Sequence, residues 1–234
     1  MSDRNFLRKF TAPISITLCV IIITTSFFQL YGEEYQEPVI FNSKFKYFTK
    51  DPITNGSKPL LWETSYFKGP NDRVLTREDI VEGHKCLGLH AYQDGANDTY
   101  DWATVHVKQR IRGNAMKQIL NKKMSAWTYP TFTYKYNKIS KEPETVFGIE
   151  INDGSKIFWF IFSNSEHRIY NLRNHRIVII NTPLNEWSYV EIDLAQHYKE
   201  AGWELPNDIS LILICGATKI WPGNYSGFIK EIVI

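Results

Sequence analysis

Hydrophobic and polar residues alternate along most of the chain from Val39 onward, and turn-forming residues interrupt the alternation every few positions. A period of two places successive side chains on opposite faces of a strand, so the pattern predicts short strands that are buried on one face. The expected strands are Val39–Phe48, Lys85–Tyr92, Trp102–Ile111, Trp127–Tyr136, Thr145–Ile151, Lys156–Ser163, Arg176–Asn181, Ser188–Ile192, Ile209–Cys215 and Gly227–Ile234.

No long amphipathic helix separates these segments in the sequence. Parallel strands would need crossovers of a dozen or more residues, so we expect mainly antiparallel sheets. The clearest hairpin joins Thr145–Ile151 to Lys156–Ser163, because Asp153-Gly154 supplies the positive φ angles of a tight turn. About ten strands with short turns favour two packed sheets over one open sheet, since each apolar face needs cover.

Two short helices are expected among the strands. The first covers Leu194–Ala201, where Asp193 accepts the first backbone amides, Gln196 completes a capping-box-like pair and Gly202 ends the helix. The second covers Ala115–Lys123. The predicted fold is therefore an all-β, two-sheet antiparallel sandwich with one or two short helices.

The N-terminus follows a different pattern. An uncharged run from Pro13 to Leu30 is preceded by Arg4, Arg8 and Lys9 and followed by three glutamates. Its 18 residues just suffice to cross a bilayer core, which takes about 17–25 helical residues. Basic residues before the run place the N-terminus on the cytoplasmic side.

We therefore expect a cytoplasmic stub at residues 1–12, a transmembrane signal-anchor at 13–31, a linker at 32–38 and a β-sandwich domain at 39–234. The chain would be a single-pass protein of the cell membrane with its C-terminal domain outside the cytoplasm. The alternative is a cleaved signal peptide, because the apolar centre is short and Thr24-Thr25-Ser26 offers small residues for cleavage.

Charge argues against one class of partner. Beyond Tyr31 the chain carries 24 Lys and Arg residues against 24 Asp and Glu residues, so the overall charge of +2 comes from the N-terminal stub. The sequence has no broad basic field of the kind that binds phosphate backbones, and nucleic acid is not an expected partner.

Cys86 and Cys215 lie outside the apolar N-terminal run. An oxidising compartment would permit them to pair, but nothing in the sequence brings them together, and unpaired buried thiols are the simpler interpretation. Asn55, Asn97 and Asn224 begin Asn-x-Ser/Thr sequons, a number close to chance expectation, so glycosylation is not inferred.

Four short motifs follow one another along the chain: Glu82-Gly83-His84-Lys85-Cys86-Leu87, Phe147-Gly148 before Asp153-Gly154, Trp187-x-x-Val190-x-Ile192-Asp193-Leu194, and Gly227-Phe228-x-x-x-Ile232. In this order they resemble the jelly-roll carbohydrate-binding-module families, also described as galactose-binding-like or lectin-like sandwiches. The resemblance spans Val39–Ile234 and implies a sandwich fold with a glycan as partner, although such motifs specify packing and turns. Many relatives hold a structural calcium with acidic residues near the end, where Lys230-Glu231 disfavours that ion.

Strand alternation gives candidate binding residues. It turns Tyr92, Trp102 and His106 away from the core, and Glu150, with Trp127 or Tyr129, extends the set. If the strands of Tyr92 and His106 pair, these side chains form one aromatic and polar platform. Such a platform suits a glycan, because aromatic faces stack on sugar C–H patches while polar groups bind hydroxyls. The alternative is aromatic packing beneath loops beside a solvated polar face.

Motifs for catalysis and transition metals are absent from the sequence. It contains no His-Glu-x-x-His, paired Cys-x-x-Cys, Gly-x-Ser-x-Gly or glycine-rich phosphate loop, so no catalytic residue, metal or cofactor is assigned. Glu191-x-Asp193 is followed by Gln196 where laminarinase-type glycosidases carry Glu. The segment Asp94–Asp101 places four oxygen-bearing side chains together, which fits a calcium loop or ordinary turns.

The sequence favours a membrane-anchored, extracytoplasmic carbohydrate-binding-like domain without a catalytic centre of its own. One alternative is a polysaccharide lyase or glycosidase-like jelly roll, for which His90, Tyr92, His106 and Arg110 offer acid–base groups. Another alternative is a structural cell-surface protein.

Overall fold

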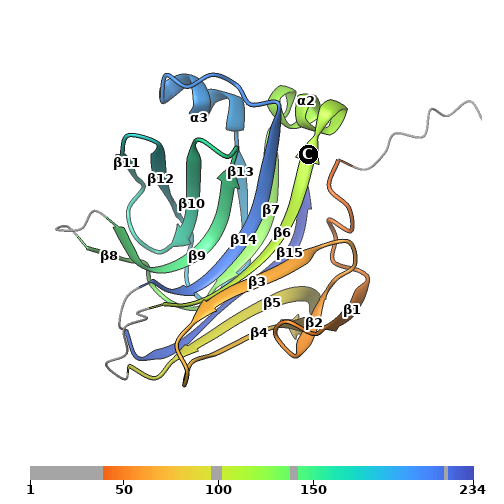
Figure 1. Ribbon diagram of the computed structural model, residues 1–234, viewed down its shortest axis with the longest axis vertical. Coiled ribbons are helices and arrows are strands. Elements are labelled where there is room, and N and C mark those ends of the chain that lie inside the picture. The colour runs from red at the N-terminus through yellow and green to blue at the C-terminus, as the bar shows by residue number, and fades with distance from the viewer. Residues whose placement is uncertain (1–38, 96–101, 138–141, 219–220) are drawn as a thin grey trace, which may run out of the picture. The chain divides into compact units, whose positions relative to one another are not determined.

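Two β-sheets pack face to face in the part of the chain that the computed structural model describes, residues 39–95, 102–137, 142–218 and 221–234 (Figure 1). All of these residues belong to one compact unit, Pro38–Ile234. The predicted all-β sandwich with two short helices is confirmed for this unit. The transmembrane segment predicted at 13–31 lies outside the described residues, and no described helix is long and apolar enough to span a membrane.

The large sheet has eight strands in the order β11-β12-β10-β9-β14-β6-β3, with β8 paired to β9. Its strands are β3 (Glu63–Lys68), β6 (Ala103–Arg112), β8 (Lys135–Asn137), β9 (Glu142–Asn152), β10 (Ile157–Ser163), β11 (Arg168–Asn171), β12 (His175–Asn181) and β14 (Asp208–Ala217). The pairing is antiparallel, as predicted, except that β10 and β12 run parallel.

The small sheet has five strands in the order β13-β7-β15-β5-β4. These are β4 (Arg73–Val81), β5 (His84–Gln93), β7 (Met124–Pro130), β13 (Ser188–Ile192) and β15 (Gly223–Val233), and a separate hairpin pairs β1 (Phe48–Asp51) with β2 (Gly56–Pro59). Among the described strands, the chain changes sheet between β3 and β4, β5 and β6, β6 and β7, β7 and β8, β12 and β13, β13 and β14, and β14 and β15. Such repeated crossing between two sheets is the connection pattern of a jelly roll.

The core lies between the two inner faces, where alternate side chains of each strand meet. Inward positions that the alternation predicted are buried in β5, β6 and β9: Leu87, Leu89, Ala91, Ala103, Val105, Val107, Ile111, Phe147, Ile149 and Ile151. The alternate positions of the same strands therefore lie on the outer faces of the sheets, where the candidate site residues are found.

The two helices, α2 (Gly113–Asn121) and α3 (Leu194–Glu200), lie at the same end of the sandwich (Figure 1). Asp193 caps α3 as predicted, because its Oδ1 accepts the Gln196 backbone N–H at 2.9 Å. Gly202, at φ +68°, ends the helix. The Gln196 side chain, however, donates to Glu200 and forms no hydrogen bond with Asp193, so the reciprocal half of the predicted capping pair is missing.

The predicted hairpin between β9 and β10 is confirmed. Asp153 accepts the backbone N–H groups of Ser155 and Lys156, at 2.8 and 2.7 Å, which closes the turn. The buried Tyr198 of α3 donates its hydroxyl to the other oxygen of Asp153 at 2.9 Å. The turn is thereby tied to the helix, and the β9–β10 register is fixed.

One predicted strand is wrong and several strands were missed. Residues 39–47 form bends and turns, because Asn42 Oδ1 accepts the backbone N–H groups of Lys46 and Tyr47 and competes with strand pairing. The predicted strand Trp127–Tyr136 is split into β7 and β8. The strands β3, β4 and β11 were missed because they are charged sheet edges, whose alternation is weak.

Cys86 and Cys215 are both buried free thiols. Cys86 belongs to the small sheet and Cys215 to the large one. Burial raises the pKa of Cys86 to about 12 and also raises the pKa of Cys215, so neither thiol is poised as a nucleophile.

Candidate functional site

The two strands that carry Tyr92 and His106 do not pair, so the single platform predicted from the sequence is wrong. Strand β5 lies in the small sheet and β6 in the large sheet. Each side chain does point away from the core, as predicted, but the two outer faces lie on opposite sides of the sandwich. Tyr92 and Trp127 therefore belong to one face, and Trp102, His106 and Glu150 belong to the other.

The outer face of the small sheet is aromatic, but the two predicted binding residues on it, Tyr92 and Trp127, lie far apart. Tyr92 holds the Arg73 guanidinium 4.8 Å from its ring, and Trp127 packs on Tyr189 with ring centres 5.5 Å apart. Tyr92 pairs with Asn224 and Trp127 with Glu231 on the intervening strand β15. At ~3.4 Å per residue these two positions on β15 are more than about 20 Å apart, too far for Tyr92 and Trp127 to hold one sugar.

On the outer face of the large sheet, strand register aligns one residue from each of seven strands. This row, called here the Glu150 row, is Glu63, Lys108, Ile212, Glu150, Trp159, Ile177 and Tyr170. Adjacent strands are ~4.8 Å apart, so the row extends roughly 29 Å across the sheet, perpendicular to the strands. Ile177 is buried, and the part from Glu63 to Trp159 covers about 19 Å, which is long enough to contact several consecutive units of a chain-like ligand.

Glu150 lies at the centre of this row and is only 8% exposed. Its Oε2 accepts the Trp159 indole N–H at 3.0 Å, and its Oε1 accepts the Asn152 side-chain amide at 3.2 Å. Burial raises the pKa of Glu150, and the two hydrogen bonds only partly oppose that effect. No ion pair joins Glu150 to a described cation, so the carboxyl is costly to bury.

Trp159 is held beside Glu150 by a second apolar cluster outside the main core. Its buried members are Tyr134, Val146, Ile161, Ile177, Ile179 and Ile214, and Trp159, Tyr136 and Tyr170 pack against them. The rings of Tyr136 and Tyr170 stack with centres 4.2 Å apart. Trp159 itself is half-buried, so it is positioned by packing yet still reaches the surface.

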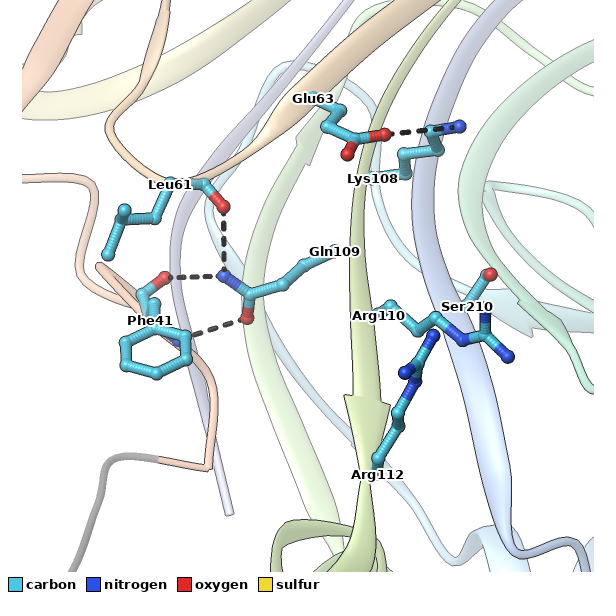
Figure 2. A pocket seen from close by; sticks show the side chains of 8 residues that line it. All are labelled: Phe41, Leu61, Glu63, Lys108, Gln109, Arg110, Arg112 and Ser210. Atoms are coloured by element: carbon cyan, nitrogen blue, oxygen red, sulfur yellow. Dashed lines mark hydrogen bonds and ion pairs between the residues drawn. The ribbon is translucent and has the colours of Figure 1, made fainter.

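Two pockets flank the Glu150 row. Tyr170 borders a pocket of about 360 Å³, also lined by Tyr134, Tyr136, Ser165, Glu166, Arg168 and Ile179. At the opposite end, Glu63 and Lys108 border a pocket of about 640 Å³, called here the basic pocket, whose other lining residues are Phe41, Leu61, Gln109, Arg110, Arg112 and Ser210 (Figure 2). Gln109 holds its wall by accepting the Phe41 N–H at 3.0 Å and donating to the Leu61 carbonyl at 3.4 Å.

His106 of β6 and Trp102, which directly precedes β6, lie on the same outer face. The His106 ring nitrogen Nε2 is 3.2 Å from Thr104 Oγ1, and its ring packs edge-on against Phe67 with centres 5.6 Å apart. Burial, aided by the Lys108 charge, lowers the pKa of His106 to about 4, so the ring is neutral at neutral pH. Trp102 is 40% exposed and packs on the same Phe67 ring.

The acid–base set considered for a lyase is divided between the two faces: His90 and Tyr92 lie in the small sheet, and His106 and Arg110 in the large sheet. Of the proposed calcium loop, Asn97, Asp98 and Asp101 lie outside the described residues. The described residues contain no cluster of three metal-ligating side chains. The Lys230 ammonium lies 4.6 Å from the Trp127 ring centre and 5.4 Å from that of Trp187, on the small sheet.

Trp159 is the central residue that the sequence did not single out. It stands in the run Ile157–Phe162, which is apolar on both faces and gives no alternation from which to choose an outward residue. The predicted hairpin nevertheless contained the information that would have identified Trp159. Pairing Asn152 with Ile157 across the turn places Glu150 opposite Trp159.

No protein-family model matches the sequence, and no curated protein matches it. Solved structures do resemble the fold. One is a carbohydrate-binding module described in a study of promiscuous specificity in the β-sandwich superfamily, with 10% identity and a TM-score of 0.37. The match covers 74% of this chain, which spans 56% of that one.

Two further similar structures contain bound sugars. The xyloglucanase domain of NopAA, a type three effector from Sinorhizobium fredii, in complex with cellobiose, shares 12% identity at a TM-score of 0.42, over 73% of this chain and 92% of that one. The family 11 carbohydrate-binding module from Clostridium thermocellum, in complex with a β-1,3-1,4-mixed-linked tetrasaccharide, shares 12% identity at a TM-score of 0.39, over 74% and 87%. These similar structures include carbohydrate-binding modules, the class that the sequence motifs resemble. Sequence identities of 10–12% and TM-scores below 0.5 do not identify a binding site in this chain.

Proposed function

We propose that the protein binds a glycan along the Glu150 row, with Trp159 and Glu150 as the central contacts. The hydrogen-bonded pair that these two residues form is the observation that carries the proposal. An indole offers a flat apolar face for sugar C–H groups, and the adjacent carboxylate accepts hydroxyl protons on lone pairs that Trp159 and Asn152 leave unused. Both side chains are pre-positioned, which lowers the entropy lost on binding.

The energetic cost of Glu150 supports a binding role. A buried carboxyl without a cationic partner opposes folding, and a neutral side chain of similar size would not carry that cost. Perturbed titratable groups of this kind gather at functional sites. Glu150 therefore stabilises the fold less than an uncharged residue would, which favours a role for this side chain in binding a ligand.

Binding fits the face better than two-carboxylate glycoside hydrolysis. That chemistry takes a pair of carboxyl groups about 5–9.5 Å apart. Glu63, the other described acid in the row, lies three strands from Glu150, about 14 Å at the backbone, and is paired with Lys108. Asp208 is four residues along the neighbouring strand, a similar distance away, and is paired with Arg110.

Glycan-array screening of the full-length protein, followed by calorimetric titration of the best ligands, tests the proposal. Trp159→Ala should weaken binding by roughly tenfold or more, as expected for loss of a central aromatic contact. Trp127→Ala is the matched control, because it removes a half-buried tryptophan from the opposite sheet. Binding that is lost in Trp127→Ala but kept in Trp159→Ala would place the site on the small sheet. The absence of binding to any glycan would favour a structural surface protein.

We also propose that residues 13–31 anchor the chain in the cell membrane, with the sandwich outside the cytoplasm and without a catalytic centre of its own. The uncharged run and its basic N-terminal flank support this topology. Protease added to intact cells should digest the sandwich. Its survival until the cells are lysed would contradict the topology, and a mature N-terminus near Phe27 would show that the segment is cleaved.

A further inference from the structure

Strand β6 carries three cations on the outer face of the large sheet. Lys108, Arg110 and Arg112 alternate with inward residues and so project to the same side. All three line the basic pocket, together with Ser210 of the neighbouring strand β14 (Figure 2). Lys108 is also a member of the Glu150 row, which connects this pocket directly to the proposed glycan site.

The cations outnumber the acids that face them. Lys108 Nζ is 3.3 Å from Glu63, and an Arg110 nitrogen is 2.9 Å from Asp208. Arg112 makes no ion pair with any residue in the described ranges. The two pairs that do form are exposed, so solvent weakens them and an anionic ligand can replace the carboxylates.

Arg110 and Arg112 extend into the same pocket. Figure 2 shows Arg110 and Arg112 reaching from β6 toward the side where Ser210 lies. Two guanidinium groups directed to one side repel each other, and a bound anion relieves that repulsion. A guanidinium can hold a carboxylate or a sulfate by two parallel hydrogen bonds, which gives direction as well as charge.

We infer that the glycan is acidic, and that the basic pocket binds its carboxylate or sulfate groups while Trp159 and Glu150 hold an adjoining neutral sugar. This inference rests on the proposed function. Lys108 lies three strands from Trp159, about 14 Å across the sheet. Glu150 repels an acidic group placed over Trp159, so the ligand carries its charges at intervals rather than on every unit.

Four polymers separate the components of this inference. Hyaluronan alternates a uronic acid with a neutral sugar, and its carboxyl-reduced form is the neutral counterpart. Carboxyl-reduced chondroitin sulfate presents sulfate without carboxylate. Poly-L-glutamate is a polyanion without sugar. Binding of each to the full-length protein is measured by calorimetry at low and at high salt.

At low salt, at least one of the two acidic polysaccharides should bind about tenfold or more tightly than carboxyl-reduced hyaluronan, and added salt should weaken that preference. Whichever of the two binds better identifies carboxylate or sulfate as the recognised group. Arg112→Ala should weaken acidic-glycan binding by roughly tenfold and leave the neutral polymer unaffected. The matched control is Arg77→Ala, an exposed, acid-paired arginine on the small sheet.

Three outcomes would overturn the inference. Neutral and acidic polysaccharides binding alike, with Arg112→Ala silent, would leave glycan binding intact and remove only the acidic preference. Poly-L-glutamate binding as tightly as the acidic glycans would show a general polyanion surface. Acidic binding that survives Trp159→Ala unchanged would separate the basic pocket from the glycan site.

Discussion

Acidification should destabilise the protein through His106. The folded state holds the pKa of this ring at about 4, against 6.5 for an unperturbed histidine, because burial and then Lys108 oppose its charge. Between those values the unfolded chain binds a proton that the folded chain does not, so the free energy of unfolding falls as pH falls. The stability is fully present above 6.5 and is lost progressively down to about 4.

The size of the effect follows from the same two values. Each pH unit in this window removes up to about 1.4 kcal/mol, so His106 alone accounts for a loss of roughly 3 kcal/mol. His106→Gln cannot titrate but keeps a polar group within reach of Thr104, so its stability should fall less over the same window. The difference between the two profiles isolates His106 from His197, whose pKa is also lowered by burial.

Urea unfolding followed by circular dichroism, from neutral pH down to about 4, measures both profiles. His84→Gln is the matched control, because His84 is exposed at the start of β5. The wild-type and His106→Gln curves should diverge below 6.5 and differ most at the acid end. Parallel curves would contradict the lowered pKa of His106, since they would show that the ring accepts a proton as easily in the folded protein as in the unfolded chain.

Three further predictions concern stability and the thiols. Glu150→Gln should gain stability relative to the wild type as pH rises above 4.5, because the folded state raises the pKa of Glu150 and resists its ionisation; a melting-temperature difference that does not change with pH would contradict this. Gly148→Ala should lower the free energy of unfolding by about 2 kcal/mol or more in urea unfolding, because a Cβ there would lie 2.1 Å from the Phe160 carbonyl oxygen. An unchanged free energy would mean that β9 and β10 can separate locally. Cys86 and Cys215 should react with an alkylating reagent only after unfolding, as mass spectrometry would show, and rapid labelling of the native protein would contradict their burial.

Local features of the fold could be predicted because their causes lie within a few residues. Asp153-Gly154 closes the β9–β10 turn, and Asp193 and Gly202 bound α3. Alternation correctly assigned the inner and outer faces of β5, β6 and β9. The edge strands escaped because charges on an edge obscure the alternation, as Arg77 and Asp79 do in β4.

The candidate site could be predicted only in part because pairing is a long-range property. Alternation shows that Tyr92 and His106 both point outward, but it does not tell which of two sheets each strand joins. The sequence therefore merged two opposite faces into one platform. Glu150 was found because it neighbours a local hairpin, whereas the Lys108–Glu150 alignment depends on β14, which is more than fifty residues away in the sequence.

A glycan bound as proposed contacts Trp159, and the indole N–H signal of that residue reports the contact. The protein has seven tryptophans, and a Trp159→Phe variant identifies the Trp159 signal in a ¹⁵N–¹H spectrum. The protein is titrated with a hyaluronan tetrasaccharide and, separately, with a neutral β-1,4-linked glucose tetrasaccharide. Whichever of the two binds should shift the Trp159 signal and leave the signals of Trp127 and Trp187 in place. Movement of the Trp127 or Trp187 signals with Trp159 unchanged would place the ligand on the small sheet and contradict binding along the Glu150 row.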